Sequence, residues 1–195
     1  MNCVSWQNNM LQESLNQFIA PVYGKTKRTP DTYRTVATRC NCNITRFLEE
    51  YRSVKNDQQL LREIRNDIDR ALRRYHEYCI EQRDGMGAHY HEVGADAETD
   101  FEHLIPAARI RDLLLAQSIT VEQALNVPTV KLSRVKHAML KEAGWSSTTP
   151  DMWCPFRRYT QVFDAKFETH DGTAIDTETW TLENHYEYFK HLIIV

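Results

Sequence analysis

The chain has 195 residues, of which 42% are hydrophobic and 26% are charged, and its formal net charge is −3. These values are typical of a folded domain with its own apolar core, and they argue against a chain that coats nucleic acid by charge alone. No apolar run approaches the roughly 18 residues of a membrane span, and the N-terminus lacks a secretory pattern, so we expect a soluble, cytoplasmic protein.

Five cysteines are spread along the chain, an odd number without a repeated spacing. Such a pattern predicts reduced thiols rather than a disulfide framework. The close pair, Cys40 and Cys42, has a C-x-C spacing that does not match the C-x-x-C of common zinc sites, and no second pair accompanies it. We therefore expect no structural zinc at this pair.

Helical periodicity dominates the first 83 residues. Apolar side chains at intervals of three or four predict helices over 5–20, 43–53 and 57–82, and the polar, basic stretch 24–36 predicts a loop that enters a helix. The 57–82 helix carries arginines away from its apolar face: Arg62, Arg65, Arg70, Arg73 and Arg74. They are typical of a solvated face that pairs with carboxylates, or alternatively of contact with a nucleic-acid backbone. We expect residues 1–83 to form a helical region for substrate binding or dimerisation.

The pattern changes after a glycine-rich break at residues 84–87. Short strands are predicted over 101–105, 129–133 and 160–170. Helices are predicted over 107–117, 120–125 (with a capping box of Thr120 and Gln123), 134–143 (capped by Ser133 and ended by Gly144) and 181–191. The expected fold class is therefore α+β, mostly helical, with a small central ββα element inside a second region, 84–195.

The segment Phe101-Glu102-His103-Leu104-Ile105-Pro106 places an acidic residue before a histidine, two aliphatic residues and a proline. This motif resembles the first strand of HNH nucleases, which belong to the ββα-metal, or His-Me finger, group. In that family the histidine ends a strand and takes a proton from water, and the preceding acidic residue reaches the metal. The resemblance implies that His103 is a general base and Glu102 a metal ligand. The alternative for His103 is a core histidine bonded to backbone.

A second segment, TVKLSRVKHAMLK over residues 129–141, reads as a strand followed by a helix that carries His137. This order resembles the second half of the same motif, in which the helix histidine binds the metal. The family's central asparagine orients the base, and Asn126 is the nearby candidate, with Pro128 between it and the strand. The alternatives are a helix-surface histidine at 137 and a helix C-cap at Asn126. The resemblance covers about 40 to 55 residues of the chain.

These residue types suit hydrolysis of a phosphodiester by in-line attack of water. Neutral imidazole at His103 accepts a proton near neutral pH, and its other nitrogen needs a fixed partner such as Asn126 or a backbone carbonyl. A divalent cation held by Glu102 and His137 would stabilise the charge that develops on the phosphate and the leaving oxygen. Mixed oxygen and nitrogen ligands suit Mg²⁺, Mn²⁺ or Zn²⁺ without deciding among them.

Further polar groups upstream of the motif are candidates for the same metal site. His89 and His91 form an H-x-H pair that would share one side of a strand, or would belong to a polar loop after the glycines. An alternating acidic run could supply another ligand or form a solvated turn: Asp96, Glu98 and Asp100.

Contacts to nucleic acid are expected on both sides of the helix at 134–143. Arg109 follows the first motif closely enough to reach the scissile phosphate. A later segment mixes aromatic and basic side chains: Trp153, Arg157, Arg158 and Tyr159. This mixture suits contact with a nucleic-acid backbone or stacking on a base, and equally suits aromatic packing in the core with the arginines in water.

The resemblance implies a metal-dependent HNH-type endonuclease that acts on DNA in the cytoplasm of a bacterial or phage-infected cell. Cutting at a palindrome would require a homodimer or two binding events. One rival hypothesis is a non-catalytic nucleic-acid-binding or regulatory protein whose histidines are structural. Others are a helical interaction protein and a similar metal site that serves a different hydrolysis.

Overall fold

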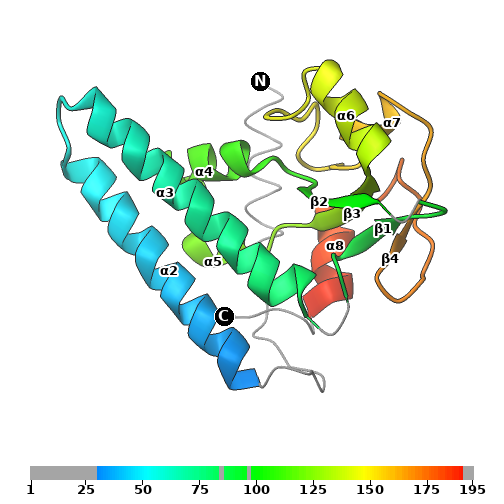
Figure 1. Ribbon diagram of the computed structural model, residues 1–195, viewed down its shortest axis with the longest axis horizontal. Helices are drawn as coiled ribbons and strands as arrows, with labels where there is room; N and C mark the ends of the chain where they lie inside the picture. Colours follow the sequence, from blue (N-terminus) through cyan, green and yellow to red (C-terminus); the bar gives the residue numbers. More distant parts are fainter. Residues whose placement is uncertain (1–29, 84–85, 96–97, 191–195) are drawn as a thin grey trace.

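The computed structural model describes residues 30–83, 86–95 and 98–190, and its class is α+β with helices dominant, which confirms the expected class (Figure 1). In chain order the elements are α2 (Pro30–Ser53), α3 (Gln58–His76), the π-helical turn η1 (Glu77–Glu81), β1 (Tyr90–Glu92), β2 (Thr99–His103), α4 (Ala107–Leu115), α5 (Val121–Leu125), β3 (Thr129–Ser133), α6 (Arg134–Glu142), α7 (Arg157–Thr160), β4 (Phe167–Thr169) and α8 (Leu182–Phe189). The helix expected over 5–20 lies outside the described residues.

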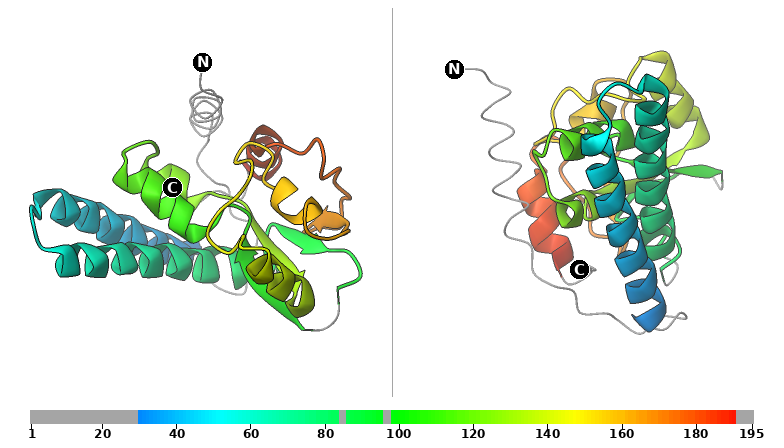
Figure 2. Two further views of the ribbon diagram at one scale, coloured as in Figure 1. Left: turned by 90° about the horizontal axis from the view of Figure 1, so that it is seen from above. Right: turned by 90° about the vertical axis from the view of Figure 1, so that its left-hand side faces the viewer.

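The two longest helices, α2 and α3, pack against each other and extend away from the sheet (Figure 2). The Asp57 side chain begins α3 by accepting the backbone N–H of Leu60 at 2.9 Å. Ile68 and Leu72, on the apolar stripe of α3, are fully buried, as the periodicity predicts. However, α2 begins at residue 30, so the expected loop over 24–36 is wrong for its described part.

The sheet has the strand order β2-β3-β1-β4 and is mixed. β2 pairs antiparallel with β3, β3 parallel with β1, and β1 antiparallel with β4. The prediction of a strand over 129–133 is confirmed, whereas the strand expected over 101–105 lies two residues earlier. Leu104 and Ile105 leave the strand to enter the core before Pro106 starts α4. The strand expected over 160–170 is reduced to β4.

Two apolar clusters make the core. The first lies between α2, α3, α4 and α5 and also takes in Met152, Leu182 and Tyr186. The second covers one face of the sheet with side chains from the C-terminal half, including Leu140, Phe156 and Phe167. The first cluster draws on both sides of residue 83, and the division of function expected at that point stays a prediction.

Two of the local signals around β3 behave as predicted. Thr120 and Gln123 form the expected capping box of α5, and Gly144, with φ +79°, follows the end of α6. Ser133 occupies the N-cap of α6 without a side-chain hydrogen bond. Within 30–83, 86–95 and 98–190, no helix combines the length and apolar character needed to cross a membrane.

Candidate active site

The strand, strand and helix that the motif predicts form one continuous unit, because α6 begins directly after β3, which pairs with β2. Side chains alternate between the two faces of a strand, so Asp100 and Glu102 lie on one face and His103 on the other. The face of Glu102 is the one that α6 covers, because Glu102 contacts His137. The two expected metal ligands, far apart in sequence, therefore lie side by side.

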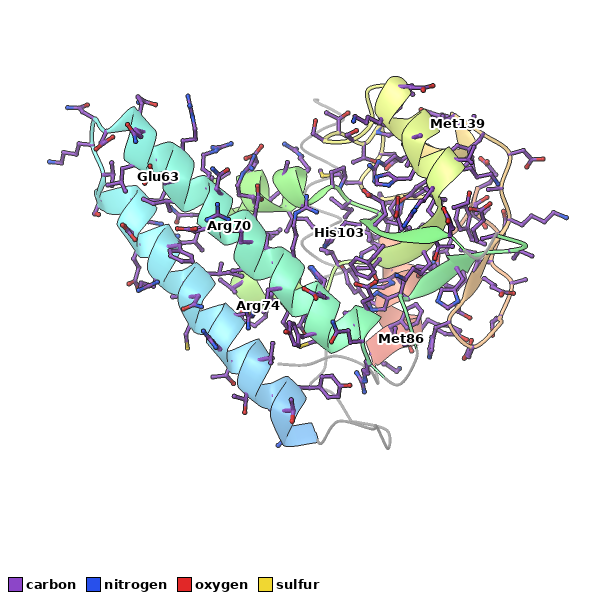
Figure 3. All side chains as sticks on the ribbon, in the orientation of Figure 1. Glu63, Arg70, Arg74, Met86, His103 and Met139 are labelled. Atoms are coloured by element: carbon purple, nitrogen blue, oxygen red, sulfur yellow. The ribbon has the colours of Figure 1, made fainter. Side chains whose placement is uncertain are left out.

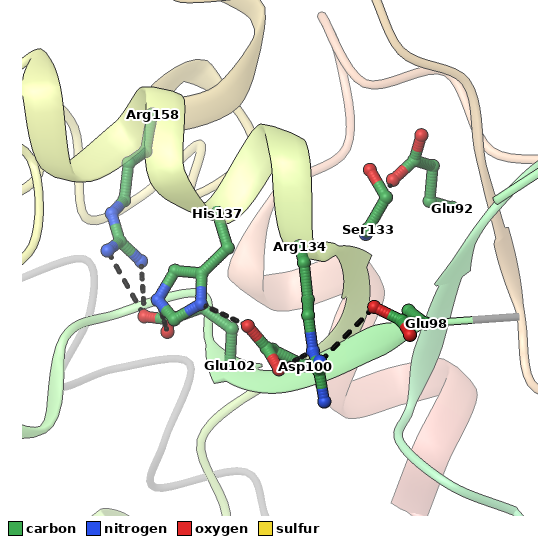
Figure 4. A network of polar contacts seen from close by, with 8 residues as sticks. All are labelled: Glu92, Glu98, Asp100, Glu102, Ser133, Arg134, His137 and Arg158. Carbon is green, nitrogen blue, oxygen red and sulfur yellow. Dashed lines mark hydrogen bonds and ion pairs between the residues drawn. The ribbon is translucent and has the colours of Figure 1, made fainter. Parts of the chain in front are cut away.

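His137 is held between two carboxylates (Figure 4). Its Nδ1 donates to Oδ2 of Asp100 at 2.8 Å, and its Nε2 lies 3.2 Å from Oε2 of Glu102. Carboxylates accept hydrogen bonds, so both ring nitrogens carry protons in this arrangement. The hydrogen bond to Glu102, supported by Asp100 and opposed by burial, raises the pKa of His137 to about 9.

Glu102 is the centre of this network. Its Oε1 accepts from both terminal nitrogens of Arg158, each at 3.1 Å, while Oε2 faces His137. Burial raises the pKa of Glu102, but the interactions with His137 and Arg158 outweigh burial and hold that pKa below its usual value. The carboxylate is therefore ionised and ready to act as an oxygen ligand at neutral pH.

The expected nucleic-acid contacts of Arg158 and Tyr159 are corrected by the structure. Both side chains are fully buried, and Arg158 also donates to the backbone oxygens of His103 and Trp145, each at 2.8 Å. A guanidinium in that position holds β2 and the end of α6 together and is closed to a phosphate. Of the two alternatives that the sequence left open, aromatic packing in the core holds for Tyr159.

The remaining candidates for substrate contact lie apart from this network. Trp153 is partly buried against the first cluster. Arg157 is half-exposed and paired with Asp151 at 3.0 Å. Arg109 is partly buried on α4 and makes no ion pair with any residue that the structure describes. Their roles in binding nucleic acid stay predictions.

Among the residues that the structure describes, no hydrogen bond joins the side chain of Asn126 to that of His103. Asn126 occupies the C-cap of α5, where its Nδ2 donates to the backbone oxygen of Glu122 at 2.7 Å. This is the helix-capping alternative that the sequence offered. The role expected from the family's central asparagine is therefore not supported by this geometry.

His103 ends β2, as the motif implies, and its ring is 4% exposed on the face opposite Glu102. Its Nε2 lies 2.9 Å from Nδ1 of His76, on the last residue of α3 (Figure 3 shows His103 where α3 meets the sheet). Burial lowers the pKa of His103 well below its ordinary value. Sequence reasoning missed His76, although its position beside Leu72 and Tyr75 on the apolar stripe of α3 marks it as a buried histidine.

The H-x-H pair does not join the metal-ligand candidates. His89 is buried with its Nδ1 2.9 Å from the Thr129 hydroxyl, and His91 Nε2 lies 2.8 Å from the Met86 carbonyl. His91 is in register with Lys131, and Lys131 with Phe101, so it lies on the sheet face opposite Glu102. His89 lies in the bend between the glycines and β1, as the loop alternative expects, although it is buried, whereas His91 is part of β1.

The donor types at Asp100, Glu102 and His137 fit a divalent cation, since oxygen and imidazole ligands suit Mg²⁺, Mn²⁺ and Zn²⁺. Among the described residues, no group of three histidine, cysteine or acidic side chains is already arranged to hold one. At this site both ring nitrogens of His137 already interact with carboxylates. Binding through Nε2 requires loss of the proton on that atom.

Comparison with known proteins gives no match: no protein-family model, no curated protein and no solved structure matches the chain. The resemblance to HNH nucleases therefore stays an expectation drawn from the two sequence motifs.

Proposed function

We propose that the chain is a metal-dependent endonuclease of the HNH type that hydrolyses phosphodiester bonds in DNA. The observation that carries this proposal is the contact between Glu102 and His137, 3.2 Å apart across a strand–strand–helix unit in the order that the motif implies. A pair of predicted ligands brought together from 35 positions apart is not a consequence of local sequence, because it depends on the pairing of β2 with β3.

Each side chain of the network has a role in this proposal. Glu102 supplies a carboxylate oxygen and His137 its Nε2 to a divalent cation. Asp100 keeps the Nδ1–H of His137, which orients the ring and makes Nε2 the nitrogen with a free lone pair. When bound, such a cation stabilises negative charge on the phosphate and the leaving oxygen.

His103 is proposed as the group that takes the proton from the attacking water, which requires that water to reach a buried ring at the end of β2, on the face opposite the proposed metal ligands. A neutral imidazole is the form that accepts a proton, and burial keeps His103 neutral by lowering its pKa. Its position at the end of β2, directly after Glu102, is that of the motif. Arg134 is the exposed guanidinium nearest this network, paired with Glu98 and Asp100 at 3.2 and 3.3 Å, and is a candidate contact for the substrate phosphate.

Cleavage of supercoiled plasmid is the direct test. We expect nicking in Mg²⁺, Mn²⁺ or Zn²⁺ that EDTA abolishes, and a fall of about 10²-fold or more for Glu102→Gln and His137→Ala, because each removes a ligand of the stabilising cation. His91→Asn is the matched histidine control on the opposite sheet face and should cleave like the wild type. Single-stranded DNA and RNA substrates in the same assay define the substrate class.

A non-catalytic nucleic-acid-binding protein is the alternative, favoured by the ion-paired state of His137 and the burial of His103. It predicts no cleavage in any metal, with binding to DNA that persists in EDTA. Absence of cleavage by a folded wild-type protein on DNA and RNA would contradict the nuclease proposal. Cleavage that survives in both ligand variants would place the chemistry elsewhere.

A further inference from the structure

We infer that His76 of α3 is a positioning residue that holds His103 in the tautomer with a bare Nδ1, taking the place that the HNH motif gives to an asparagine. The assignment of the tautomer stands on two hydrogen bonds and on the burial of both rings, and its consequence for turnover rests on the proposed function. It would make the long helical pair a part of the active site, because α3 belongs to the region expected to serve only substrate binding or dimerisation.

A backbone carbonyl fixes the proton of His76. Nε2 of His76 lies 3.1 Å from the carbonyl oxygen of Leu125, and a carbonyl oxygen accepts hydrogen bonds and never donates them. The proton therefore lies on Nε2 of His76. Burial lowers the pKa of His76 to about 4, against smaller opposing effects of the Leu125 and Leu72 backbone, so the ring carries one proton at neutral pH.

The position of the proton on His76 determines the tautomer of His103. A neutral His76 with its proton on Nε2 presents a lone pair at Nδ1, and Nε2 of His103 lies 2.9 Å from that atom. Nε2 of His103 must then be the donor. His103 is 4% exposed and no carboxylate among the described residues pairs with its ring, so the ring carries a single proton, on Nε2, and no hydrogen bond that the structure describes engages Nδ1.

This arrangement has the features that a general base requires. One ring nitrogen is tied to a fixed acceptor, and the other keeps a lone pair for a proton. The two rings meet edge to face with centroids 4.7 Å apart, and His76 is fully buried, so the acceptor is held by the core rather than by solvent. Asn126 caps α5. The last residue of that helix, Leu125, supplies the carbonyl that accepts the hydrogen bond from His76.

Two substitutions of similar size separate the functions of the two His76 nitrogens. His76→Asn places an amide oxygen near the position of Nδ1 and can still accept from His103, but it is too short to reach Leu125. His76→Gln reaches Leu125 with its amide and leaves His103 without its acceptor. Thermal denaturation measures the loss of stability in each variant. We expect the two losses to be similar, because each variant keeps one of the two buried hydrogen bonds of His76.

The experiment combines ¹⁵N NMR of the histidine rings with plasmid cleavage by the full chain. In the wild type and His76→Asn we expect a pyridine-like Nδ1 and a pyrrole-like Nε2 for His103, and in His76→Gln a mixture of both tautomers. We expect kcat to fall about 10–100-fold in His76→Gln with KM unchanged, and to recover in His76→Asn.

A pyrrole-like Nδ1 in wild-type His103 would overturn the inference, as would a His76→Gln protein that keeps both the tautomer and the wild-type kcat. The expected tautomers without cleavage by any form would instead contradict the proposed nuclease and leave the tautomer assignment standing. The two failures are distinguishable because the NMR measurement does not depend on turnover.

Discussion

Replacing Arg158 with methionine is expected to lower the free energy of unfolding by about 3–5 kcal/mol. Arg158 is fully buried and donates to Glu102 and to the backbone oxygens of His103 and Trp145. The substitution leaves a carboxylate that is 16% exposed with one fewer cation beside it, and two backbone oxygens without this donor. Urea denaturation of the two proteins measures the difference.

Arg157→Met is the matched control, one residue away on the same short helix. The Arg157 side chain is 46% exposed and makes an ion pair with Asp151, so its removal should cost about 0–1 kcal/mol. Adding Glu102→Leu to Arg158→Met removes both buried charges, and the double variant should be less destabilised than the sum of the single changes. Equal, small losses in the two single variants would contradict the buried role, and selective loss of DNA binding in Arg158→Met would restore the phosphate contact.

The elements that could be predicted from sequence are those specified by neighbouring residues. The capping box of α5 needs Thr120 and Gln123 alone, and β3 is bounded by Pro128 and by the helix that follows. The apolar stripe of α3 is likewise a local pattern. By contrast, the polar residues 30–36 of α2 predict a loop, although Tyr33 begins a buried stripe that continues through Ala37 and Cys40.

The candidate site was predicted only in part, because its decisive contacts join distant residues. Glu102 and His137, the two metal ligands that the motif predicts, lie in contact, and their role as ligands stays a prediction. The motif could not indicate that His103 meets His76, 27 positions earlier, or that Arg158 enters the core to meet Glu102, 56 positions earlier. A buried guanidinium is stable only when several acceptors converge on it, and that convergence is a property of the tertiary structure.

Internal ion pairs explain why the positions of basic residues in the sequence do not predict which basic side chains are exposed. Arg158 and Glu102 pair inside the protein, and Arg111 pairs with Asp69 and Asp112 nearer the surface. Arg158, which the sequence predicts as a contact to nucleic acid, therefore makes its contacts inside the protein. Arg134 is not among the contacts predicted from the sequence. Its side chain is 62% exposed beside His137 and is better placed to meet a substrate.

A second large effect is expected from pH, in the metal-free protein. Between pH 6 and pH 9 the wild type should lose about 1–2 kcal/mol more of its free energy of unfolding than His137→Gln, which cannot titrate. The carboxylates of Glu102 and Asp100, which form a clamp around His137, raise its pKa from 6.5 to about 9. The folded state therefore binds this proton more tightly than the unfolded state. The full shift corresponds to roughly 3 kcal/mol, and solvent screening at a ring that is 38% exposed reduces it.

The direction follows from the raised pKa. The stabilisation is complete below the unfolded pKa of about 6.5 and is lost as pH rises through about 9, where the folded ring releases its proton. Urea denaturation in EDTA at pH 6, 7, 8 and 9 gives both profiles, and parallel profiles would show that the clamp between Asp100 and Glu102 does not hold a proton. If Glu102 and His137 bind a cation as proposed, saturating Mn²⁺ replaces the Nε2 proton, and the wild-type profile should flatten toward that of the variant.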